Sequence, residues 1–374
     1  MKRNDVMTND LVFPVAGASG DILVGVFPGE GIGPEVVSAA LDVLDELAAA
    51  SERRVDIRFG GAIGNEALRQ GGRSLTDDAV AFAESVFAAG GALFCGAGGA
   101  RFVYELRARF DLFCKLTPLR PNPELADAAL LRAESLMDVD IVAVRENTGG
   151  LYFGRERVSA DDDGRRHAET TFGYGSDEIA RILTAAARVA SGRDGKVCVV
   201  VKRDGVTAIS NLWIAGMERL RGQWPVDWEV LDIDNAAYQL IADPSRFDVI
   251  VSPNMFGDVL ADCGSALLAS RGMSYSGNFS DAGRAVYQTG HGAAYDIAGT
   301  GTANPLGQIL SLAMMLEHSF GWRDGAQLIR RAVGDALGRG VRTADIRGPH
   351  AAVSCQEMTR AVCESLRALL KEPV

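Results

Sequence analysis

The sequence predicts an α/β fold with a largely parallel sheet, and three observations support this prediction. Short β-rich runs, among them VDIVAVREN, KVCVVVK and FDVIVSP, alternate with helical segments along the chain, as they do in βαβ units. Two predicted strands lead directly into glycine-rich turns, in FPGEGIGPE and in FCGAGGA. The length of 374 residues exceeds what one ordinary core accommodates and favours about two domains.

The predicted elements follow in chain order. A strand over residues 22–27 leads through a glycine-rich turn into a helix that has Pro34 at its first position. A second helix is predicted behind a cap at Ser176, because apolar residues follow at helical spacing. The segment over residues 304–320 is apolar on nearly all sides, which predicts a helix buried in the core or in an interface. The polar segment over residues 151–174 interrupts the alternation, and is either an exposed loop or an arm that pairs with a second subunit.

Composition narrows the class of protein. The net charge of -11 argues against sequence-independent nucleic-acid binding, which relies on clustered Lys and Arg. The six cysteines show no CxxC spacing and are typical of the reduced, buried thiols of a cytosolic protein. Residues 1–21 lack the long apolar core of a signal peptide, and no apolar run reaches the ~18–20 residues of a membrane span. We therefore expect a cytoplasmic protein with no nucleic-acid or membrane partner.

The segment VSPNMFGDVLADCGSALLAS, over residues 251–270, carries the strongest indication of chemistry. It is expected to run from the end of a strand into a helix, where Asp258 and Asp262 stand four residues apart on one face of the first turn. Two carboxylates so placed suit a hard cation such as Mg2+ or Mn2+. The alternative is that these acids only complement the dipole at the helix N-terminus.

Three further residues are candidates near the ends of predicted strands. Arg145 could bind a carboxylate through two hydrogen bonds, and Tyr152, seven residues on, could donate a proton. The alternative for these two is a surface ion pair and a packed aromatic ring. Lys202 ends the run KVCVVVK, at the end of a strand where α/β active sites form, and a desolvated lysine there could act as a base.

A nucleotide-binding signature is less distinct. Neither GEGIGPE nor GAGGAR satisfies the GxGxxG fingerprint of the Rossmann fold. The segment GHGAAYDIAGTGTANP offers small residues for close backbone approach, and one acid, Asp296, that could bond the hydroxyl groups of a ribose. The alternative is a plain glycine-rich turn.

Taken together, several motifs resemble the β-decarboxylating dehydrogenase family, which contains the 3-isopropylmalate, isocitrate, homoisocitrate and tartrate/D-malate dehydrogenases. The motifs occur in order between residues 22 and 346, and they are FPGEGIGPEV, VRENTGGLYFG, DNAAYQL, NMFGDVLAD, HGAAYDIAGTGTANP and VRTADI. TGGLYFG is most similar to isopropylmalate dehydrogenase, whereas RENT is more like the isocitrate and D-malate members.

The resemblance implies a fold of two α/β domains with the active site in the cleft between them. Residues 1–112 and 269–374 would form a discontinuous, cofactor-side domain. Residues 113–268 would form the second domain, which carries dimerisation, metal and substrate residues and an arm at about 150–174. The active unit implied is a homodimer with shared active sites.

The resemblance also assigns residues to the metal and to proton transfer. Asp258 and Asp262 match the metal ligands of one subunit, and Asp234 matches the ligand supplied by the neighbouring subunit. Lys202 matches the catalytic lysine, also supplied across the dimer, and Tyr152 matches the tyrosine that protonates the enol product.

For substrate and cofactor, the resemblance assigns further residues. Arg107 and Arg145 match two of three arginines that bind the malate carboxylates. The substituent on C3 is expected to meet the helix face that carries Val103 and Tyr104. The cofactor loop implied by the resemblance contains His291, Gly292, Asp296 and Asn304, and an acid at position 296 goes with NAD rather than NADP.

The sequence departs from the family pattern in the arginine clamp. Thr117, in KLTPL, occupies the position of the third arginine. Lys115 lies two residues earlier, on the same face of an extended segment, and could partly replace the lost charge, and Arg120 is a second candidate. The other departures lie in the first glycine-rich turn, after the catalytic lysine and before the histidine loop, at Glu30, Asp204, Gln288 and Thr289.

The function implied is metal-dependent, NAD-linked oxidative decarboxylation of a 3-substituted malate, either an isopropylmalate-like 2-hydroxy diacid or a specialised analogue. A tartrate/D-malate or isocitrate/homoisocitrate dehydrogenase is an alternative within the family. An alternative of another class is a non-catalytic, regulatory subunit of a hetero-oligomeric dehydrogenase. Loss of an arginine favours that subunit, whereas retention of Tyr152, Lys202 and all three aspartates disfavours it.

Overall fold

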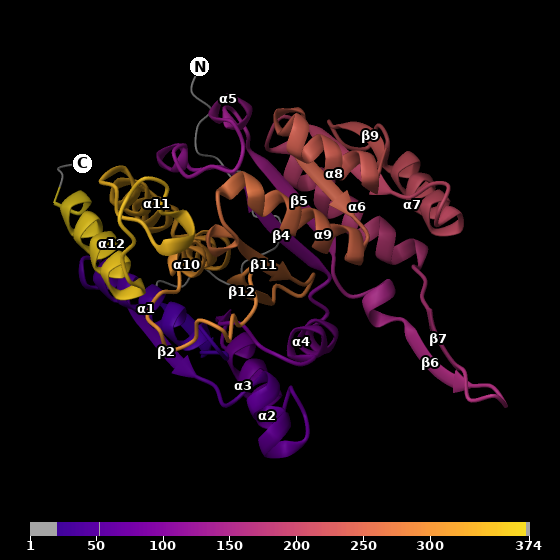
Figure 1. The fold of residues 1–374 in the computed structure, drawn as a ribbon, viewed down its shortest axis with the longest axis horizontal. Coiled ribbons are helices and arrows are strands. Elements are labelled where there is room, and N and C mark those ends of the chain that lie inside the picture. The colour runs from indigo at the N-terminus through magenta and orange to yellow at the C-terminus, as the bar shows by residue number, and fades with distance from the viewer. Residues whose placement is uncertain (1–20, 52, 372–374) are drawn as a thin grey trace.

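The computed structural model describes residues 21–51 and 53–371. A ten-stranded sheet runs through the molecule, with helices on both of its faces (Figure 1). The strands of this sheet are β1 (Ile22–Phe27), β2 (Val55–Phe59), β3 (Ala92–Cys95), β4 (Cys114–Leu119), β5 (Ile141–Glu146), β8 (Lys196–Val201), β9 (Asp227–Asp232), β10 (Val249–Ser252), β11 (Tyr275–Phe279) and β12 (Ala285–Thr289). A separate two-stranded sheet consists of β6 (Arg155–Ala160) and β7 (Arg166–Thr171).

The helices fill the connections between these strands. They are α1 (Gly33–Ala49), α2 (Gly64–Gly71), α3 (Asp77–Ala88), α4 (Phe102–Phe110), α5 (Ala133–Leu136), α6 (Ser176–Ser191), α7 (Thr207–Leu220), α8 (Ile233–Ala242), α9 (Asn254–Gly264), α10 (Leu306–Phe320), α11 (Arg323–Gly338) and α12 (Cys355–Leu369).

The strand order is β2-β1-β3-β12-β11-β4-β5-β10-β8-β9. Most neighbours are parallel, which confirms the predicted α/β class. The exceptions lie in the centre of the sheet, where β11 runs antiparallel to β12 and β4, and β4 runs antiparallel to β5. Of these pairs, only β11 with β4 joins strands that are distant in sequence, and no local pattern could have predicted it.

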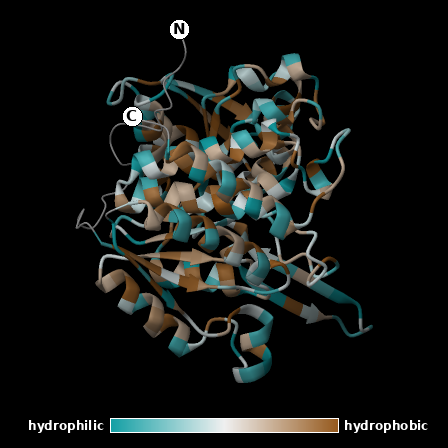
Figure 2. Ribbon diagram, turned by 90° about the vertical axis from the view of Figure 1, so that its left-hand side faces the viewer, coloured by the Kyte–Doolittle hydropathy of each residue, from teal (hydrophilic) through white to brown (hydrophobic). Residues whose placement is uncertain are grey.

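Residues 22–95 and 285–289 supply four strands at one end of the sheet, and residues 114–252 supply five at the other. One apolar cluster nevertheless contains Ile22 and Val197 from the two ends. The division into domains at 112/113 and 268/269 therefore stays a prediction. Figure 2 shows hydrophobic residues gathered in the strands and on the helix faces that pack against them.

The first glycine-rich turn docks against the loop predicted to bind a cofactor. Gly31 has a φ of +61°, and a Cβ there would lie 1.9 Å from the carbonyl oxygen of Ala293. Ile32 N–H donates to the same oxygen at 2.9 Å. Only glycine permits this conformation together with so close an approach. The helix that follows, α1, carries Pro34 in its first turn, as predicted.

The cap predicted at Ser176 is wrong by one residue. The N-cap of α6 is Gly175, whose backbone N–H donates to the Glu178 carboxylate at 2.6 Å. Glu178 supplies the capping interaction from inside the helix, so the residue before it needs no side chain.

The helix α10 lies in the core, which decides between the two alternatives for the apolar segment. Nearly all its residues are buried, and it packs on α1, α11 and β12. The segment over residues 151–174 contains β6 and β7, an exposed antiparallel hairpin that projects away from the body of the molecule (Figure 1). The segment is therefore exposed, as expected for a loop, but it forms a regular hairpin, and its pairing with a second subunit stays a prediction.

All six cysteines lie among the described residues and all are free thiols, five of them buried. Within residues 21–371, leaving out residue 52, no helix combines the length and the apolar character that a membrane crossing requires.

Candidate active site

A cleft of about 240 Å³ lies where α4, β4, β5 and α9 meet. It is not the largest cavity among the described residues, but it gathers four of the charged residues predicted for chemistry, Arg107, Lys115, Arg145 and Asp258. The predicted site residues that line it are Val103, Tyr104, Arg107, Lys115, Arg145, Asp258, His291 and Gly292. The glycine-rich segment over residues 96–98 forms another part of its wall.

Local structure explains how the cationic side chains meet. Lys115 and Arg145 are direct partners in the antiparallel register of β4 and β5. Val103, Tyr104 and Arg107 stand at helical spacing on α4, so they share one face. Arg107, Lys115 and Arg145 are all buried, with exposed fractions of 4%, 7% and 3%. Three buried cations in one cleft require an anion in or beside it.

Asp258 is the anion at the centre of this group. The Arg145 guanidinium donates to one carboxylate oxygen of Asp258, and the Tyr152 hydroxyl donates to the other at 2.9 Å. The same guanidinium donates twice to Asn254 Oδ1, at 2.9 and 2.7 Å. Asn254 is itself held by the Tyr174 hydroxyl, which accepts from its backbone N–H at 2.9 Å. The arginine is therefore fixed on two sides before any ligand arrives.

The ionisable groups in the cleft shift one another's pKa values. Burial would raise the pKa of Asp258, but Arg145, Lys115, the Tyr152 hydroxyl and Arg107 outweigh it and lower the pKa, so the carboxylate stays ionised. Burial and Asp258 raise the pKa of Tyr152 to about 12, so the phenol keeps its proton at neutral pH. Burial, reinforced by Arg107 and Arg145, lowers the pKa of Lys115 to about 7.

Asp258 and Asp262 both lie on one helix, but they do not lie in its first turn. The helix α9 begins at Asn254, and its first turn contains no acid. The alternative that the two acids complement the helix dipole is therefore wrong, because that effect is confined to the first turn. The Asp262 carboxylate accepts from Arg271 at 3.1 Å.

Lys202 and Asp234 lie apart from the cleft. The Lys202 ammonium donates to Asp234 at 2.6 Å, and both side chains are exposed, by 37% and 70%. The hydrogen bond to Asp234 raises the pKa of Lys202 and lowers that of Asp234. Within the described residues of this single chain, no three His, Cys, Asp or Glu side chains come together as a metal site would require.

The residues that depart from the family's arginine clamp lie in different places. Lys115 lines the cleft beside the two arginines, whereas Thr117, also buried, is absent from the lining residues. Arg120 is wrong as a replacement for the third arginine. It follows β4 at the far end of the strand and lines a different cavity, because five extended residues separate it from Lys115 by about 17 Å.

The predicted cofactor loop divides into two parts. His291 and Gly292 line the cleft, and the His291 Nε2 atom is buried with no hydrogen-bond partner among the described residues. Asp296 is exposed and lies outside the cleft lining. Asn304 is buried, and its amide donates to Asp345 at 3.1 Å while its Oδ1 accepts from Leu306 N–H at 2.9 Å.

Glu30 ties three loops together beside the cleft, which the sequence analysis noted only as a departure. Its carboxylate accepts from the backbone N–H groups of Glu66 at 2.6 Å and Gly99 at 2.8 Å, and from the Tyr295 hydroxyl at 3.1 Å. Burial would raise the pKa of Glu30, but these hydrogen bonds outweigh it and lower the pKa. The glycine-rich turn thereby holds the cofactor loop in place.

Asn254 and Tyr174 are the functional residues that the sequence analysis missed. Asn254 stands in the motif NMFGD, four residues before Asp258, so the same helical spacing could have identified it. No local signal identifies Tyr174, because its contact with Asn254 spans 80 positions of the chain.

The sheet order and the cationic cleft are typical of an α/β enzyme with an anionic ligand. Residues 23–362 match the isocitrate/isopropylmalate dehydrogenase family, and the chain belongs to it. The chain is therefore a decarboxylating dehydrogenase, and the predicted resemblance to isopropylmalate dehydrogenase is confirmed.

Similar proteins agree with this assignment. The chain is 39% identical over 357 residues to a 3-isopropylmalate dehydrogenase of Hahella chejuensis, which covers 91% of this chain and 98% of the relative. It is 38% identical over 357 residues to the Bacillus licheniformis enzyme of the same name, with 92% and 95% covered. Among solved structures, isocitrate dehydrogenase from Methylococcus capsulatus superposes with a TM-score of 0.83, at 28% identity and with 92% and 99% covered.

Proposed function

We propose that this enzyme catalyses the metal-dependent, NAD-linked oxidative decarboxylation of a 3-substituted malate. One observation carries the proposal: Arg107, Lys115 and Arg145 line a cleft together with the ionised Asp258, whose carboxylate accepts from the protonated Tyr152. A 2-hydroxy diacid supplies two carboxylates for such cations, and Tyr152 stands ready as a proton donor.

The substrate side of the cleft favours a substituted malate over malate itself. Val103 and Tyr104 line the cleft on the same helix face as Arg107, and they offer an apolar wall to a substituent on C3. The Tyr104 ring packs edge-on to the Tyr152 ring, with their centroids 5.5 Å apart. A bulky or aromatic substituent would extend this packing.

The altered clamp favours a specialised substrate. Lys115 brings one charge on a flexible stem where an arginine would bring a planar fork, and Thr117 brings no charge. Thr117→Arg should therefore improve turnover of isopropylmalate by about 10- to 100-fold relative to the native substrate, because a bidentate charged contact is worth ~1.5–3 kcal/mol. If the wild-type enzyme turns over isopropylmalate at an ordinary rate and the variant changes nothing, the chain is an isopropylmalate dehydrogenase with a tolerated substitution.

The residues that would hold Mg2+ or Mn2+ are Asp258 and Asp262 of one chain and Asp234 of the partner subunit. Asp258 and Asp262 fit this role because they stand four residues apart on α9, and the Asp258 carboxylate is held ionised. When bound, the metal supplies a Lewis acid for charge that develops on the substrate oxygen. The Asp234 carboxylate is largely exposed, as a ligand offered to another chain must be.

For NAD, the proposed binding residues are His291, Gly292, Asp296 and Asn304. The Nε2 atom of His291 is buried beside the cleft and has no hydrogen-bond partner among the described residues, as expected for a ring nitrogen that would bond a ligand. Asn304 would act by shaping the loop through its bonds to Asp345 and Leu306. The Asp296 carboxylate, exposed at the far side of the loop, would accept the ribose hydroxyls of NAD and repel the 2′-phosphate of NADP.

Proton transfer is assigned to two residues. Lys202 of the partner subunit would help remove the hydroxyl proton as hydride leaves C2 for NAD. Tyr152 would return a proton after carbon dioxide departs, since its raised pKa keeps the phenol protonated until then.

The active unit we propose is a homodimer, with the β6–β7 hairpin as an arm that pairs with the partner. Exposed apolar side chains gather on the packed helices α8 and α9, next to Asp234, and they are Tyr238, Ile241 and Val259. Such a patch on a charged surface is typical of an interface. A cytoplasmic location is proposed with it, because all six cysteines are free thiols.

The test is a screen of purified protein with Mn2+ and NAD against 3-substituted malates, isocitrate, homoisocitrate, D-malate and tartrate. We expect metal-dependent NADH formation with at least one substituted malate. If the best substrate is D-malate, tartrate, isocitrate or homoisocitrate, the proposed apolar, isopropylmalate-like substituent is wrong although the reaction stands. If none of these compounds gives NADH, the alternative of a non-catalytic subunit of a hetero-oligomer would be favoured.

A further inference from the structure

A buried amide, Asn254, holds one edge of the guanidinium group of Arg145. Asn254 is fully buried at the start of α9, and this helix packs against β5, the strand that carries Arg145 (Figure 1). The Oδ1 atom of Asn254 accepts from Arg145 Nε at 2.9 Å and from Nη2 at 2.7 Å. A carboxylate could accept the same two bonds, but an amide accepts them without neutralising the positive charge.

The two bonds to Asn254 decide which edge of the guanidinium group remains for a ligand. The N–H groups of an arginine form a side fork at Nε and Nη2 and an end fork at Nη1 and Nη2. Asn254 fills the side fork, and Nη1 donates to Asp258. Since Arg145 lines the cleft, a bidentate contact with a ligand carboxylate is left to the end fork.

The aliphatic stem of Arg145 is held by the same helix. A Cβ at Gly257 would lie 2.8 Å from both Cβ and Cγ of Arg145. A larger residue at this position would therefore push the stem or the helix away. Gly257 and Asn254 stand three residues apart, so one face of α9 meets both the stem and the head of the arginine.

Asn254 is itself fixed in one orientation. Its Nδ2 atom donates to the carbonyl oxygen of Gly149 at 2.9 Å, and its backbone N–H donates to the Tyr174 hydroxyl at 2.9 Å. A flipped amide would place its oxygen against the Gly149 oxygen, so the network keeps Oδ1 toward Arg145. The Tyr174 hydroxyl also hydrogen-bonds the buried Glu146 carboxylate, which extends the network away from the cleft.

Packing holds Tyr174 in place. Gly150 has a φ of +71°, and a Cβ there would collide with the Tyr174 hydroxyl, so the second glycine of TGGLYFG makes room for it. The Tyr174 ring packs edge-on against the buried Trp213 ring, with their centroids 5.7 Å apart. The residue that anchors Asn254 is therefore confined on both sides.

The neutrality of Asn254 matters because Arg145 already has one anionic partner. Asp258 supplies a carboxylate to Nη1. A second carboxylate at position 254 would set two negative charges against one guanidinium group and would repel an incoming diacid. With an amide at this position, the positive charge of Arg145 still attracts an anion.

We propose that Asn254 is a positioning residue for the substrate carboxylate. It holds the side fork of Arg145, leaves the end fork to the substrate and leaves the charge of the guanidinium group unneutralised. This role rests on the proposed function, since it takes Arg145 to bind a carboxylate of the diacid.

The test is steady-state kinetics at saturating NAD and Mn2+, with the compound that gives the fastest NADH formation in the substrate screen. Asn254→Asp keeps the shape and the acceptor oxygen but adds a negative charge. The KM for the diacid should therefore rise about tenfold or more, while kcat changes by less than about threefold. The same compound, titrated calorimetrically without NAD, should show the same loss of affinity.

A second variant separates orientation from charge. The side chain of Asn254→Ser is too short to reach the guanidinium group, so KM should rise about threefold to tenfold because the arginine is no longer held. This variant buries no new charge, so it is expected to fold even if Asn254→Asp does not. Thermal unfolding of each variant shows whether it is folded.

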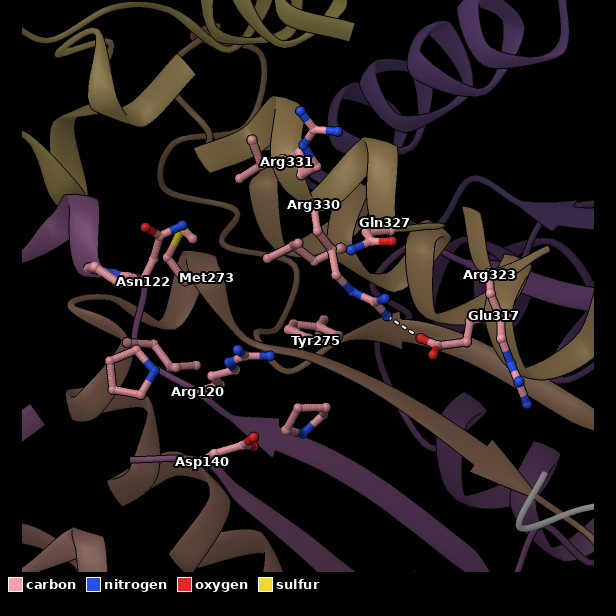
Figure 3. Close-up of a pocket in the computed structure, with 16 residues that line it drawn as sticks. Arg120, Asn122, Asp140, Met273, Tyr275, Glu317, Arg323, Gln327, Arg330 and Arg331 are labelled. Carbon is pink, nitrogen blue, oxygen red and sulfur yellow. Dashed lines mark hydrogen bonds and ion pairs between the residues drawn. The ribbon is translucent and has the colours of Figure 1, made fainter. Parts of the chain in front are cut away.

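Two further variants locate the effect. Asn122→Asp makes the same substitution beyond the other end of β4, on the wall of a different cavity (Figure 3). Asn122 Oδ1 accepts from Glu124 N–H at 3.0 Å, a bond that an aspartate retains, so KM should not change. Arg145→Lys tests the proposed function itself, and it should raise KM about tenfold or more, because an ammonium group has no planar fork.

The contrary results are distinct. An unchanged KM in both Asn254 variants, a loss confined to kcat, or an equal rise of KM in Asn122→Asp would each overturn the positioning role. If KM rises in Arg145→Lys but not in the Asn254 variants, this role is wrong and the proposed function stands. If Arg145→Lys leaves KM unchanged, or if no compound gives NADH, the proposed function fails and this role fails with it.

Discussion

The cleft around Asp258 and the surface pair of Lys202 and Asp234 carry residues of one proposed active site. Within a single chain, however, the first group is buried and the second is exposed. Around Asp258 the side chains are buried, interlocked and shifted in pKa by burial and by each other. Lys202 and Asp234 are exposed and bonded to each other. The comparison shows that packing within one chain can organise one half of the proposed site, the cleft around Asp258. The other half, Lys202 and Asp234, stays on the surface, where a second chain would be needed to bring it to a cleft.

The strongest way to break this comparison is to inactivate the two halves in separate chains. Lys202→Ala and Asp258→Asn should each lower kcat by about 10²–10⁴-fold, as expected for loss of a proton-transfer group or a metal ligand. If the active sites are shared, an equal mixture of the two inactive chains should recover about a quarter of the wild-type activity, because half of the dimers would be mixed and each would hold one intact site.

Exchange of subunits is measured first, for example with a size-tagged chain, so that a negative result is informative. Each variant mixed with itself serves as the control. Mixed dimers that form but remain inactive would show that Lys202 and Asp258 act within one chain, against the surface arrangement seen here.

A second test concerns the cleft side of the comparison. Tyr152→Phe removes the hydroxyl that donates to Asp258 and leaves the ring packing with Tyr104 in place. We expect kcat to fall about 10²-fold with little change in KM, because the phenol is proposed to act in proton return rather than in binding. The measurement is steady-state kinetics. A loss confined to KM would make Tyr152 a binding residue instead.

The pKa of Lys115 sharpens the comparison further. Burial, with Arg107 and Arg145, lowers this pKa to about 7, so the free enzyme loses the ammonium charge as the pH rises through that value. The diacid binds the charged form, and kcat/KM should therefore fall about tenfold per pH unit above pH 7. Lys115→Arg keeps its charge and should flatten this limb. A wild-type profile that stays flat from pH 7 to 9 would contradict the role of Lys115.

The smallest effect is expected at the exposed end of the cofactor loop. Asp296→Lys should shift the ratio of kcat/KM for NAD and NADP by about tenfold toward NADP, because it replaces repulsion of the 2′-phosphate by attraction in a solvent-exposed place. Asp296→Asn, which only removes the charge, should shift it less. An unchanged ratio in both variants would place the ribose elsewhere.

Relations between residues close in sequence could be predicted, whereas contacts between residues far apart in sequence could not. Asp258 and Asp262 could be placed on one helix, and α10 could be identified as buried, because helical spacing is a local property. Arg120 does not join the clamp, because it lies five extended residues beyond Lys115 and lines a different cavity. Tyr174 was missed because it reaches Asn254 only in the folded chain.

By itself, the sequence determined the α/β class, the family and the chemical types present in the site, because periodicity and short motifs are carried by neighbouring residues. Only the tertiary structure decided that Lys115 rather than Arg120 joins Arg107 and Arg145, and that Lys202 and Asp234 stay on the surface. It also decided the antiparallel pairing of β11 with β4 at the centre of the sheet. The physical reason is the same in each case: which end of a strand a side chain occupies, and which distant strand pairs beside it, are set by packing across the whole chain.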